Sequence, residues 1–251
     1  MLLSGGLDSA VLLAEEASRA DVQPLYIKVG LAWEALELCA VRAFLAALAV
    51  PPIKEGHGTP WTSTRRPAIR PLVELSMDMR DVYPPSHWAV AGRPPEYHTP
   101  DEDVYLAGRN IILLGKAGVY CGSAGIGRLA LGTLGHNPFP DATRTFRQAM
   151  ATALSLGLDR ALAIDAPYAG VDKVEVVRRG VALGVPMELT LSCMKPVTPG
   201  SPVEERAVTG DSSARVLHCG TCSKCRERHD AFVAAGVADP TRYADRSFVD
   251  R

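Results

Sequence analysis

The hexapeptide SGGLDS, Ser4–Ser9, carries the residue types of an anion site close to the start of the chain. Its two glycines allow a sharp turn and let a ligand approach the backbone closely. A helix beginning immediately afterwards would direct its unpaired N–H groups and its positive dipole end at the same spot. The pattern therefore predicts a phosphate site, in which Ser4 and Ser9 add hydroxyl donors and Asp8 holds a bridging Mg²⁺ ion.

A purely structural alternative for this hexapeptide is a glycine turn capped by Ser4. The segment lacks the Gly-Lys-Ser/Thr ending of a Walker A loop and the G-x-G-x-x-G spacing of a dinucleotide site. We favour the phosphate site because the complete hexapeptide stands between an expected strand and an expected helix. Only residues 1–3 remain to form that strand, so either the strand is short or a few natural residues are missing from this chain.

Four cysteines near the C-terminus form a second group that could do chemistry. Cys219, Cys222 and Cys225 follow C-x₂-C-x₂-C spacing, and Cys193 in LSCMKP is the natural fourth ligand. Four thiolates suit a tetrahedral structural Zn²⁺ ion and leave no open position for catalysis. An Fe–S cluster is the alternative. We expect zinc, which would hold the following helix, CRERHDAF, against the main domain and contribute folding free energy.

Alternating strand and helix patterns would position both groups. Helices are expected at residues 9–19, 33–48, 108–122, 143–157, 171–185 and 225–232. Strands are expected at residues 22–29, 128–135 and 162–170, with a weak signal near Ile53. This alternation predicts an α/β fold with a doubly wound parallel sheet and helices on both faces. We place the main domain at residues 1–192 and a small zinc-binding helical lobe at residues 193–251.

Residues 60–105 break the alternation. Prolines cluster there at Pro84–Pro85 and Pro94–Pro95, with aromatic side chains among them. A long segment with little periodicity is usually functional, so we expect an irregular insertion that could act as a lid. A meandering surface insertion is the alternative.

Loops at one edge of the predicted sheet carry most of the polar groups. Ligands of such sheets bind beyond the carboxyl ends of the strands. The loops at those ends are residues 4–9, 29–34, 132–143 and 166–173. The candidate site is therefore assembled from stretches that are distant in the sequence.

Length, composition and charge limit the classes of function. The chain has 251 residues, 27 lysines and arginines, 28 aspartates and glutamates, and 47% hydrophobic residues, which suits a globular protein with a core. The net charge of −1 and the lack of a basic stripe argue against extended nucleic-acid binding. No apolar run is long enough to span a bilayer and no signal peptide precedes the opening loop, so we expect a cytoplasmic protein without a membrane partner.

The opening hexapeptide resembles the PP-loop, S-G-G-x-D-S, of the N-type ATP pyrophosphatases. Those enzymes cleave ATP between its α- and β-phosphates and activate a carboxylate or carbonyl oxygen as an adenylate. The resemblance implies an adenine nucleotide alpha hydrolase-like, Rossmann-like fold, with ATP and Mg²⁺ as cofactors. Lys173 would add a positive charge beside the phosphates. The loop residues implied in ATP binding are Ser4, Gly5, Gly6, Leu7, Asp8 and Ser9.

The loop and the cysteine segment together resemble the 7-cyano-7-deazaguanine synthases of queuosine biosynthesis. The resemblance covers nearly the whole chain, including AGRN at residues 107–110 and the segments 130–142 and 166–190, in the family's order. It implies that ATP adenylates 7-carboxy-7-deazaguanine, that ammonia displaces AMP to give an amide, and that a second activation dehydrates the amide to a nitrile. Free ammonium is the simplest ammonia source, since no glutaminase domain is present. Homodimers are common in the resembled family.

The same resemblance implies several site residues. Arg109 and Asn110 would contact ATP or the substrate carboxylate, and Asp8, Lys173 and Arg109 would be the catalytic residues. Asp141, which follows Pro140, could recognise the donor edge of a guanine-like base. Surface ion pairing is the alternative for Arg109, Asn110 and Asp141.

Departures from the family pattern lie on the substrate side. The family typically shows an aspartate–tyrosine–glycine–glutamine stretch with a histidine, where this chain reads YIKVGLAWE at residues 26–34 and only Gly30 clearly matches. Trp33 offers a stacking face and Glu34 a carboxylate for the substrate, although both could belong to a helix start instead. The family's aspartate–cysteine pair is Asp141–Ala142 here. The chain is therefore interpreted as a divergent member.

Three hypotheses follow from these features. The first is the deazaguanine nitrile synthase. The second is a divergent relative that adenylates and then amidates, or conjugates through, another carboxylate. The third is a zinc-stabilised nucleotide-binding or tRNA-modifying protein, which the neutral charge and the lack of a basic appended domain disfavour.

Overall fold

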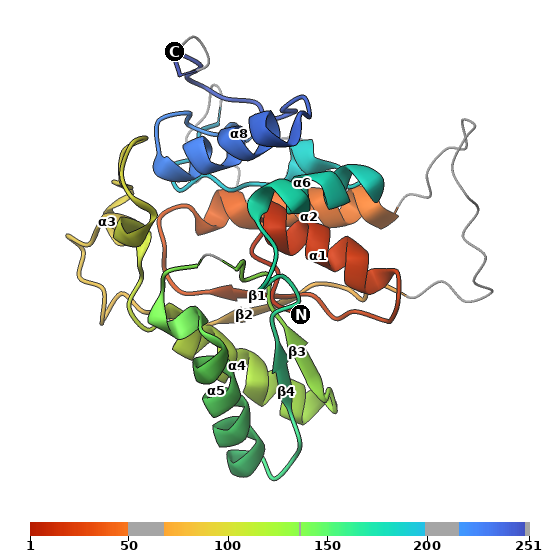
Figure 1. The fold of residues 1–251 in the computed structure, drawn as a ribbon. Helices are drawn as coiled ribbons and strands as arrows, with labels where there is room; N and C mark the ends of the chain where they lie inside the picture. The colour runs from red at the N-terminus through yellow and green to blue at the C-terminus, as the bar shows by residue number, and fades with distance from the viewer. Residues whose placement is uncertain (50–67, 136, 199–215, 249–251) are drawn as a thin grey trace.

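The computed structural model describes residues 1–49, 68–135, 137–198 and 216–248 (Figure 1). Two pairs of parallel strands form its sheet. Strand β1 (Leu25–Lys28) pairs with β2 (Val73–Ser76), with Leu25 opposite Val73, and β3 (Arg128–Ala130) pairs with β4 (Ala163–Asp165). The predicted strands are thus confirmed, although each is shorter than its apolar run.

Residues 1–3 join the two strand pairs. The Leu3 N–H donates to the Leu25 carbonyl at 2.9 Å, and the Leu2 N–H donates to the Ala130 carbonyl at 2.9 Å. Leu2 forms a parallel bridge with Leu25. The order across the sheet is therefore β2, β1, residues 1–3, β3 and β4, and the opening loop leaves from its centre.

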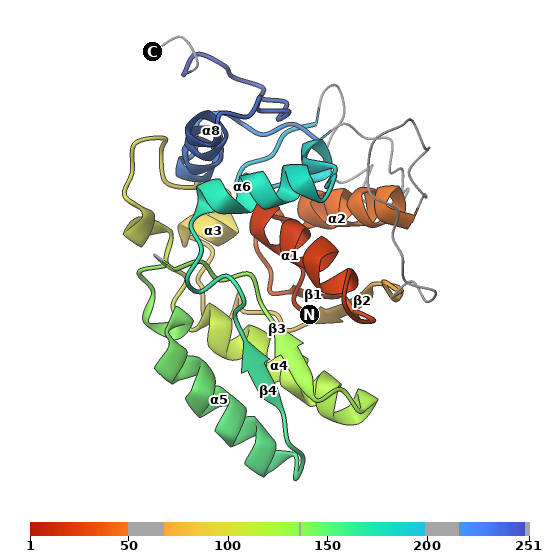
Figure 2. The same cartoon turned by 45° about the vertical axis from the view of Figure 1, so that its right-hand side comes forward.

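Helices cover both faces of this sheet (Figures 1 and 2). Helices α1 (Leu7–Ala17), α2 (Glu34–Ala49) and α6 (Lys173–Ala182) lie on one side, and α4 (Arg109–Ala124) and α5 (Arg144–Gly157) lie on the other. Helix α8 (Ser223–Ala235) packs on α6. The doubly wound α/β architecture is confirmed.

Side chains of β1 alternate between the two cores, as the period of a strand requires. Leu25 and Ile27 pack in one cluster with Leu114 of α4, whereas Tyr26 packs in the other with Leu7 of α1. Each core cluster also contains residues of the C-terminal segment. That segment is thus built against the sheet domain, and the division at residue 193 stays a prediction.

The segment expected to be irregular contains an element of the sheet. Strand β2 lies within residues 60–105, together with the one-turn helix α3 (Trp88–Ala91) and a 3₁₀ turn at Asp101–Val104. The prediction of an irregular segment was wrong at β2, because a four-residue strand with alternating exposure carries too little apolar signal. The weak strand signal near Ile53 lies outside the described residues, and a role of residues 60–105 as a lid stays a prediction.

Two further 3₁₀ turns, Pro140–Ala142 and Met187–Leu189, precede α5 and follow α6. Within the described ranges, no helix combines the length and the apolar character needed to cross a bilayer.

Candidate active site

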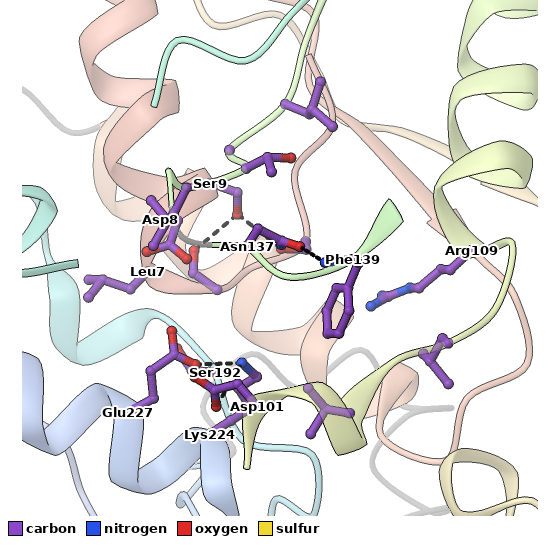
Figure 3. Close-up of a pocket in the computed structure, with 18 of the residues that line it drawn as sticks. Leu7, Asp8, Ser9, Asp101, Arg109, Asn137, Phe139, Ser192, Lys224 and Glu227 are labelled. Carbon is purple, nitrogen blue, oxygen red and sulfur yellow. Dashed lines mark hydrogen bonds and ion pairs between the residues drawn. The ribbon is translucent and has the colours of Figure 1, made fainter. Parts of the chain in front are cut away.

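A cavity of about 550 Å³ lies where the N-terminal ends of α1, α4 and α6 converge with α8 (Figure 3). It is lined by ten of the residues predicted for the site: Ser4, Gly6, Leu7, Asp8, Ser9, Trp33, Arg109, Asn110, Asp141 and Lys173. Gly5, Glu34 and Pro140 do not line it. The structure therefore brings together most of the residues that were predicted from separate stretches of the chain.

The opening loop turns directly from the sheet into α1. Gly5 has φ +75°, in the left-handed region, and a Cβ atom there would lie 2.8 Å from Cγ2 of Val41. Gly6 is the N-cap of α1, and no side chain of the described residues caps this helix. Its first-turn N–H groups are thus available to an anion in the cavity.

Gly5→Ala is expected to destabilise the protein. The left-handed conformation costs a residue with a Cβ about 1–2 kcal/mol, and the contact with Val41 adds to that cost. The matched control is Gly157→Ala at the end of α5, where an added Cβ meets nothing within 4 Å. Denaturant unfolding should show a loss for the first variant and none for the second; equal free energies of unfolding would contradict this account of the loop.

A row of alternating charges crosses the cavity from α1 to α8. Lys173 Nζ lies 2.8 Å from Asp8 Oδ2 and 2.9 Å from Glu227 Oε1, and Lys224 Nζ lies 2.5 Å from Glu227 Oε2. Lys224 and Arg226 also face Asp101, at 3.8 and 3.7 Å. The predicted pair of Asp8 and Lys173 is therefore in direct contact.

Burial and partners set the protonation of this row. Burial favours the neutral form of Asp8 and raises the pKa of its carboxyl, although Lys173 opposes that rise and the side chain retains 23% exposure. Burial works against the charge of Lys173, but Asp8 and Glu227 outweigh it and raise the pKa of the ammonium group. Burial likewise opposes ionisation of Glu227, but Lys173 and Lys224 lower the pKa of its carboxyl to about 2.

The donor set beside Asp8 fits a magnesium ion. Oxygen Oδ1 of Asp8 is buried and has no hydrogen-bond partner among the described residues. An unpaired carboxylate oxygen next to a helix N-terminus that can take phosphates is the kind of ligand that Mg²⁺ prefers. The orphaned atom therefore agrees with the predicted metal-holding role of Asp8.

Arg109 and Asn110 begin α4 after Gly108, whose φ is +77°. The Asn110 N–H donates to Asp141 Oδ2 at 3.1 Å, and its side-chain amide donates to the Asp141 carbonyl at 3.1 Å. Asp141 thus holds the start of α4 in place. Arg109 lines the cavity, and its buried Nε has no hydrogen-bond partner within the described ranges.

Aromatic rings form two walls of the cavity. Trp33 stacks on Trp88, with ring centroids 5.9 Å apart and planes at 13°, and Tyr105 stacks on Phe139 with centroids 5.0 Å apart. All four line the cavity. Such walls suit a planar heterocycle, and three of the four rings were not predicted as site residues.

Of the two glutamates at the start of α2, the predicted Glu34 does not line the cavity, whereas Glu37 does. The Glu34 carboxylate accepts hydrogen bonds from the backbone N–H groups of Val29 and Gly30, at 2.7 and 2.9 Å, and so closes the loop after β1. Glu37, one turn further along α2, is the glutamate that lines the cavity. The sequence analysis did not single out Glu37, because its position in an apolar helix resembles that of a core residue.

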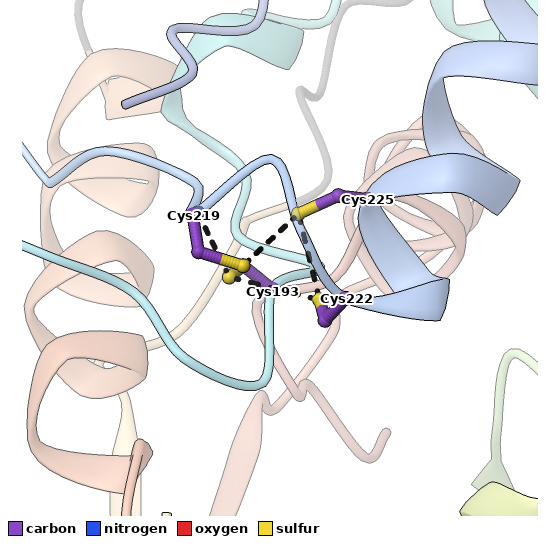
Figure 4. A group of neighbouring side chains, drawn as sticks. All are labelled: Cys193, Cys219, Cys222 and Cys225. Carbon is purple, nitrogen blue, oxygen red and sulfur yellow. Dashed lines mark hydrogen bonds between the residues drawn. The ribbon is translucent and has the colours of Figure 1, made fainter. Parts of the chain in front are cut away.

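The four predicted cysteines converge on one buried point (Figure 4). Their sulfur atoms all lie within 4.8 Å of one another, with 3.5 Å between Cys222 and Cys225 and 3.8 Å between Cys219 and Cys225. A tetrahedron with Zn–S bonds of about 2.3 Å has edges of about 3.8 Å. Backbone N–H groups of Cys219 and Lys195 donate to Cys193 Sγ at 3.2 and 3.3 Å, which suits a thiolate. The cluster is a candidate metal site that fits Zn²⁺.

The cysteine cluster is adjacent to the cavity. Helix α8 starts at Ser223, immediately after Cys222, and carries Cys225 and Glu227 in its first turns. Glu227 was not predicted as a site residue, because its helix was expected only to be held against the main domain by zinc. Only the packing of α8 on α6 brings it to Lys173.

Comparisons with known proteins identify the family of this chain. A family model described as "Queuosine biosynthesis protein QueC" matches residues 1–236. A 7-cyano-7-deazaguanine synthase of Azoarcus sp. (strain BH72) is 33% identical over 149 residues, which is 57% of this chain and 58% of that protein. A 7-cyano-7-deazaguanine synthase of Cupriavidus pinatubonensis (strain JMP 134 / LMG 1197) is 30% identical over 251 residues, which is 97% of this chain and 96% of the relative. The chain therefore belongs to the QueC family of queuosine biosynthesis proteins.

Proposed function

We propose that this protein is an AMP-forming, ATP-dependent carbon–nitrogen ligase that converts 7-carboxy-7-deazaguanine and ammonia to 7-cyano-7-deazaguanine. The observation that carries the proposal is the Asp8 oxygen that has no partner in the described part of the chain, beside a start of α1 that no described side chain caps, in a cavity with aromatic walls. Family membership and the relatives named 7-cyano-7-deazaguanine synthase support the choice of substrate.

The chain's own residues suit the first chemical step. A carboxylate is inert to ammonia until one of its oxygens becomes a good leaving group, and the adenylate provides that leaving group. The first-turn N–H groups of α1 and the charge of Lys173 would orient the phosphates. Arg109, with its unpartnered Nε, would stabilise negative charge that develops on phosphate or carboxylate oxygens. A Mg²⁺ ion held by Asp8 would supply Lewis-acid stabilisation of the phosphate oxygens.

The zinc ion is proposed to be structural. Four buried thiolates would complete its coordination, so no open position remains for substrate. The metal would act on catalysis through α8, which carries Glu227 and Lys224 to the cavity.

A mass-spectrometric assay tests the proposed function. The protein is incubated with ATP, Mg²⁺, ammonium and 7-carboxy-7-deazaguanine, and both AMP and the base are followed. A product with the mass of the nitrile is expected. AMP without nitrile would indicate an arrested or altered reaction, and no AMP with this acid would reject the proposed substrate.

The second candidate is a divergent relative that adenylates another carboxylate. The Trp33–Trp88 pair favours it, since the resembled family typically places a histidine in this stretch, whereas here Trp33 lines the cavity and stacks on Trp88. Its mark in the same assay would be ATP turnover to AMP only when a different planar acid replaces the deazaguanine acid.

A further inference from the structure

Glu37 is a buried carboxylate in the cavity wall to which no role has been assigned. It lies one helical turn after Trp33 on α2, lines the cavity, and is 8% exposed. The Tyr26 hydroxyl donates to its Oε2 at 2.6 Å. A Cβ on Gly5 would lie 3.5 Å from Glu37 Cγ, so the side chain packs against the loop that faces the phosphates.

Its partners set Glu37 apart from the other described carboxylates that line the cavity. Asp8, Asp101 and Glu227 have cationic partners, and Asp141 and Asp172 accept backbone N–H groups. Within the described ranges, Glu37 has no cationic group within 4 Å and accepts no backbone N–H group. A neutral hydroxyl donor favours the ionised carboxylate less strongly than an ion pair does.

The groups around Glu37 place its protonation near neutrality. Burial raises the pKa of Glu37 to about 7, and the charge of Glu34 adds to this rise. Arg109, which faces it from α4, and hydrogen bonds from Tyr26 and Trp33 act in the opposite direction. Burial keeps Tyr26 protonated by raising its own pKa, so that phenol acts only as a donor.

We propose that Glu37 is the general base that removes a proton from the nitrogen nucleophile in this cavity, an inference that rests on the proposed function. Ammonia attacks the carbonyl carbon of the acyl adenylate and forms the C–N bond. The C–O bond to AMP breaks, AMP leaves with the electron pair, and the positively charged nitrogen loses one proton to the Glu37 carboxylate. The amide remains, and the proton passes from Glu37 to water.

The same position serves the second half of the reaction. The amide oxygen attacks the α-phosphorus of a second ATP and pyrophosphate leaves, while one N–H proton is lost to solvent. In the resulting imidate, the remaining N–H proton passes to Glu37. The electron pair of that N–H bond forms the third carbon–nitrogen bond of the nitrile, and the C–O bond to AMP breaks as AMP leaves. Both steps place a proton acceptor beside the same carbon and nitrogen atoms.

Glu37→Gln separates this role from a structural one, because glutamine preserves the volume and still accepts from Tyr26. The protein is mixed with ATP, Mg²⁺, 7-carboxy-7-deazaguanine and ammonia, and rapid-quench mass spectrometry follows the acyl adenylate and the amide separately. The measurement is repeated over a series of pH values at which the concentration of unprotonated ammonia is held constant. We expect the variant to form adenylate at the wild-type rate, to form amide about 10²-fold more slowly, and to lose the acid limb that the wild type shows near pH 7. Glu74→Gln, on the exposed edge strand β2, should behave as the wild type.

Tyr26→Phe provides the matched readout. Loss of the hydroxyl donor removes a bond that favours the ionised carboxylate, so the acid limb should move to higher pH while the limiting rate at high pH is kept. Three results would each overturn the role of Glu37. Glu37→Gln could form amide at a rate within about threefold of the wild type, or could lose adenylate and amide formation together. The acid limb of Tyr26→Phe could stay at the pH of the wild type. A wild-type protein that makes no adenylate from this acid would instead overturn the proposed function.

Discussion

Asp8→Asn is expected to lower AMP formation by about 10³-fold or more, since Lewis-acid stabilisation of phosphate oxygens is worth several kcal/mol. The substitution removes the carboxylate whose Oδ1 has no hydrogen-bond partner among the described residues. It also removes the partner that lies 2.8 Å from Lys173, whose ammonium group would then be held by Glu227 alone. Asparagine keeps the volume of the side chain, so the start of α1 should remain folded.

The measurement is AMP release from ATP in the presence of the acid, together with zinc content and thermal unfolding. Both zinc content and the unfolding temperature should stay near the wild-type values. Asp165→Asn is the matched control, because that carboxylate forms a half-exposed ion pair with Arg128 outside the cavity. AMP formation by Asp8→Asn within tenfold of the wild type would show that Asp8 is not the metal-holding carboxylate.

Local signals were sufficient for the parts of the site that depend on short stretches of sequence. The spacing of Ser4–Ser9 predicted a turn into a helix, and the structure has Gly5 in the left-handed region and α1 beginning at Leu7. The cysteine spacing predicted a cluster, and the sulfur atoms lie within 4.8 Å of one another. The loop and the spacing of Cys219, Cys222 and Cys225 are set by backbone geometry over a few residues, whereas Cys193 was assigned to the cluster as its fourth ligand from a separate segment.

The remaining site residues depend on packing between distant elements. Glu227 reaches Lys173 only because α8 packs on α6, and its local sequence resembles a solvated helix. Glu37 lines the cavity because the period of α2 places it one turn after Trp33. From sequence, Glu34 looks equally suited to be the carboxylate in the cavity, but the structure shows that it closes the loop after β1. The aromatic walls combine rings from α3 and from three loops, and no periodic pattern links them.

Strand β2 illustrates the same limit for the fold. Its four residues alternate between half-buried and exposed positions, as expected at the edge of a sheet. The charged Glu74 on this strand pairs with Lys28 and Arg42 rather than with the core. A strand held mainly by backbone hydrogen bonds to β1 carries too weak an apolar pattern to be predicted.

Removal of the zinc ion is expected to unfold the C-terminal segment and to abolish AMP formation. Structural zinc sites contribute about 10–16 kcal/mol of apparent binding free energy in small domains, compared with about 5–15 kcal/mol for the stability of a whole protein. Without the metal, the four buried sulfur atoms would take up protons and lose the bonds that join them in the core cluster that they share with the sheet. Chelation or Cys222→Ser should therefore lower the midpoint of thermal unfolding sharply. Cys39→Ser, at a half-buried position on α2, should change the free energy of unfolding by about 1 kcal/mol or less.

The effect on catalysis should be indirect, through α8. Cys222 is the N-cap residue of this helix and Cys225 lies in its first turn, so a metal held by both would fix the point from which Glu227 reaches Lys173. Glu227→Gln tests this link without disturbing the cysteines: the variant should keep its zinc and its fold but bind ATP more weakly, because the ion pair that holds the Lys173 ammonium group in position is lost. If Cys222→Ser remained folded with wild-type AMP formation, the cluster would have no part in positioning the site. Glu227→Gln could instead bind ATP and form AMP as the wild type does, while Cys222→Ser forms no AMP. The metal would then support the fold alone, and the charge row from α1 to α8 would not link the metal to catalysis.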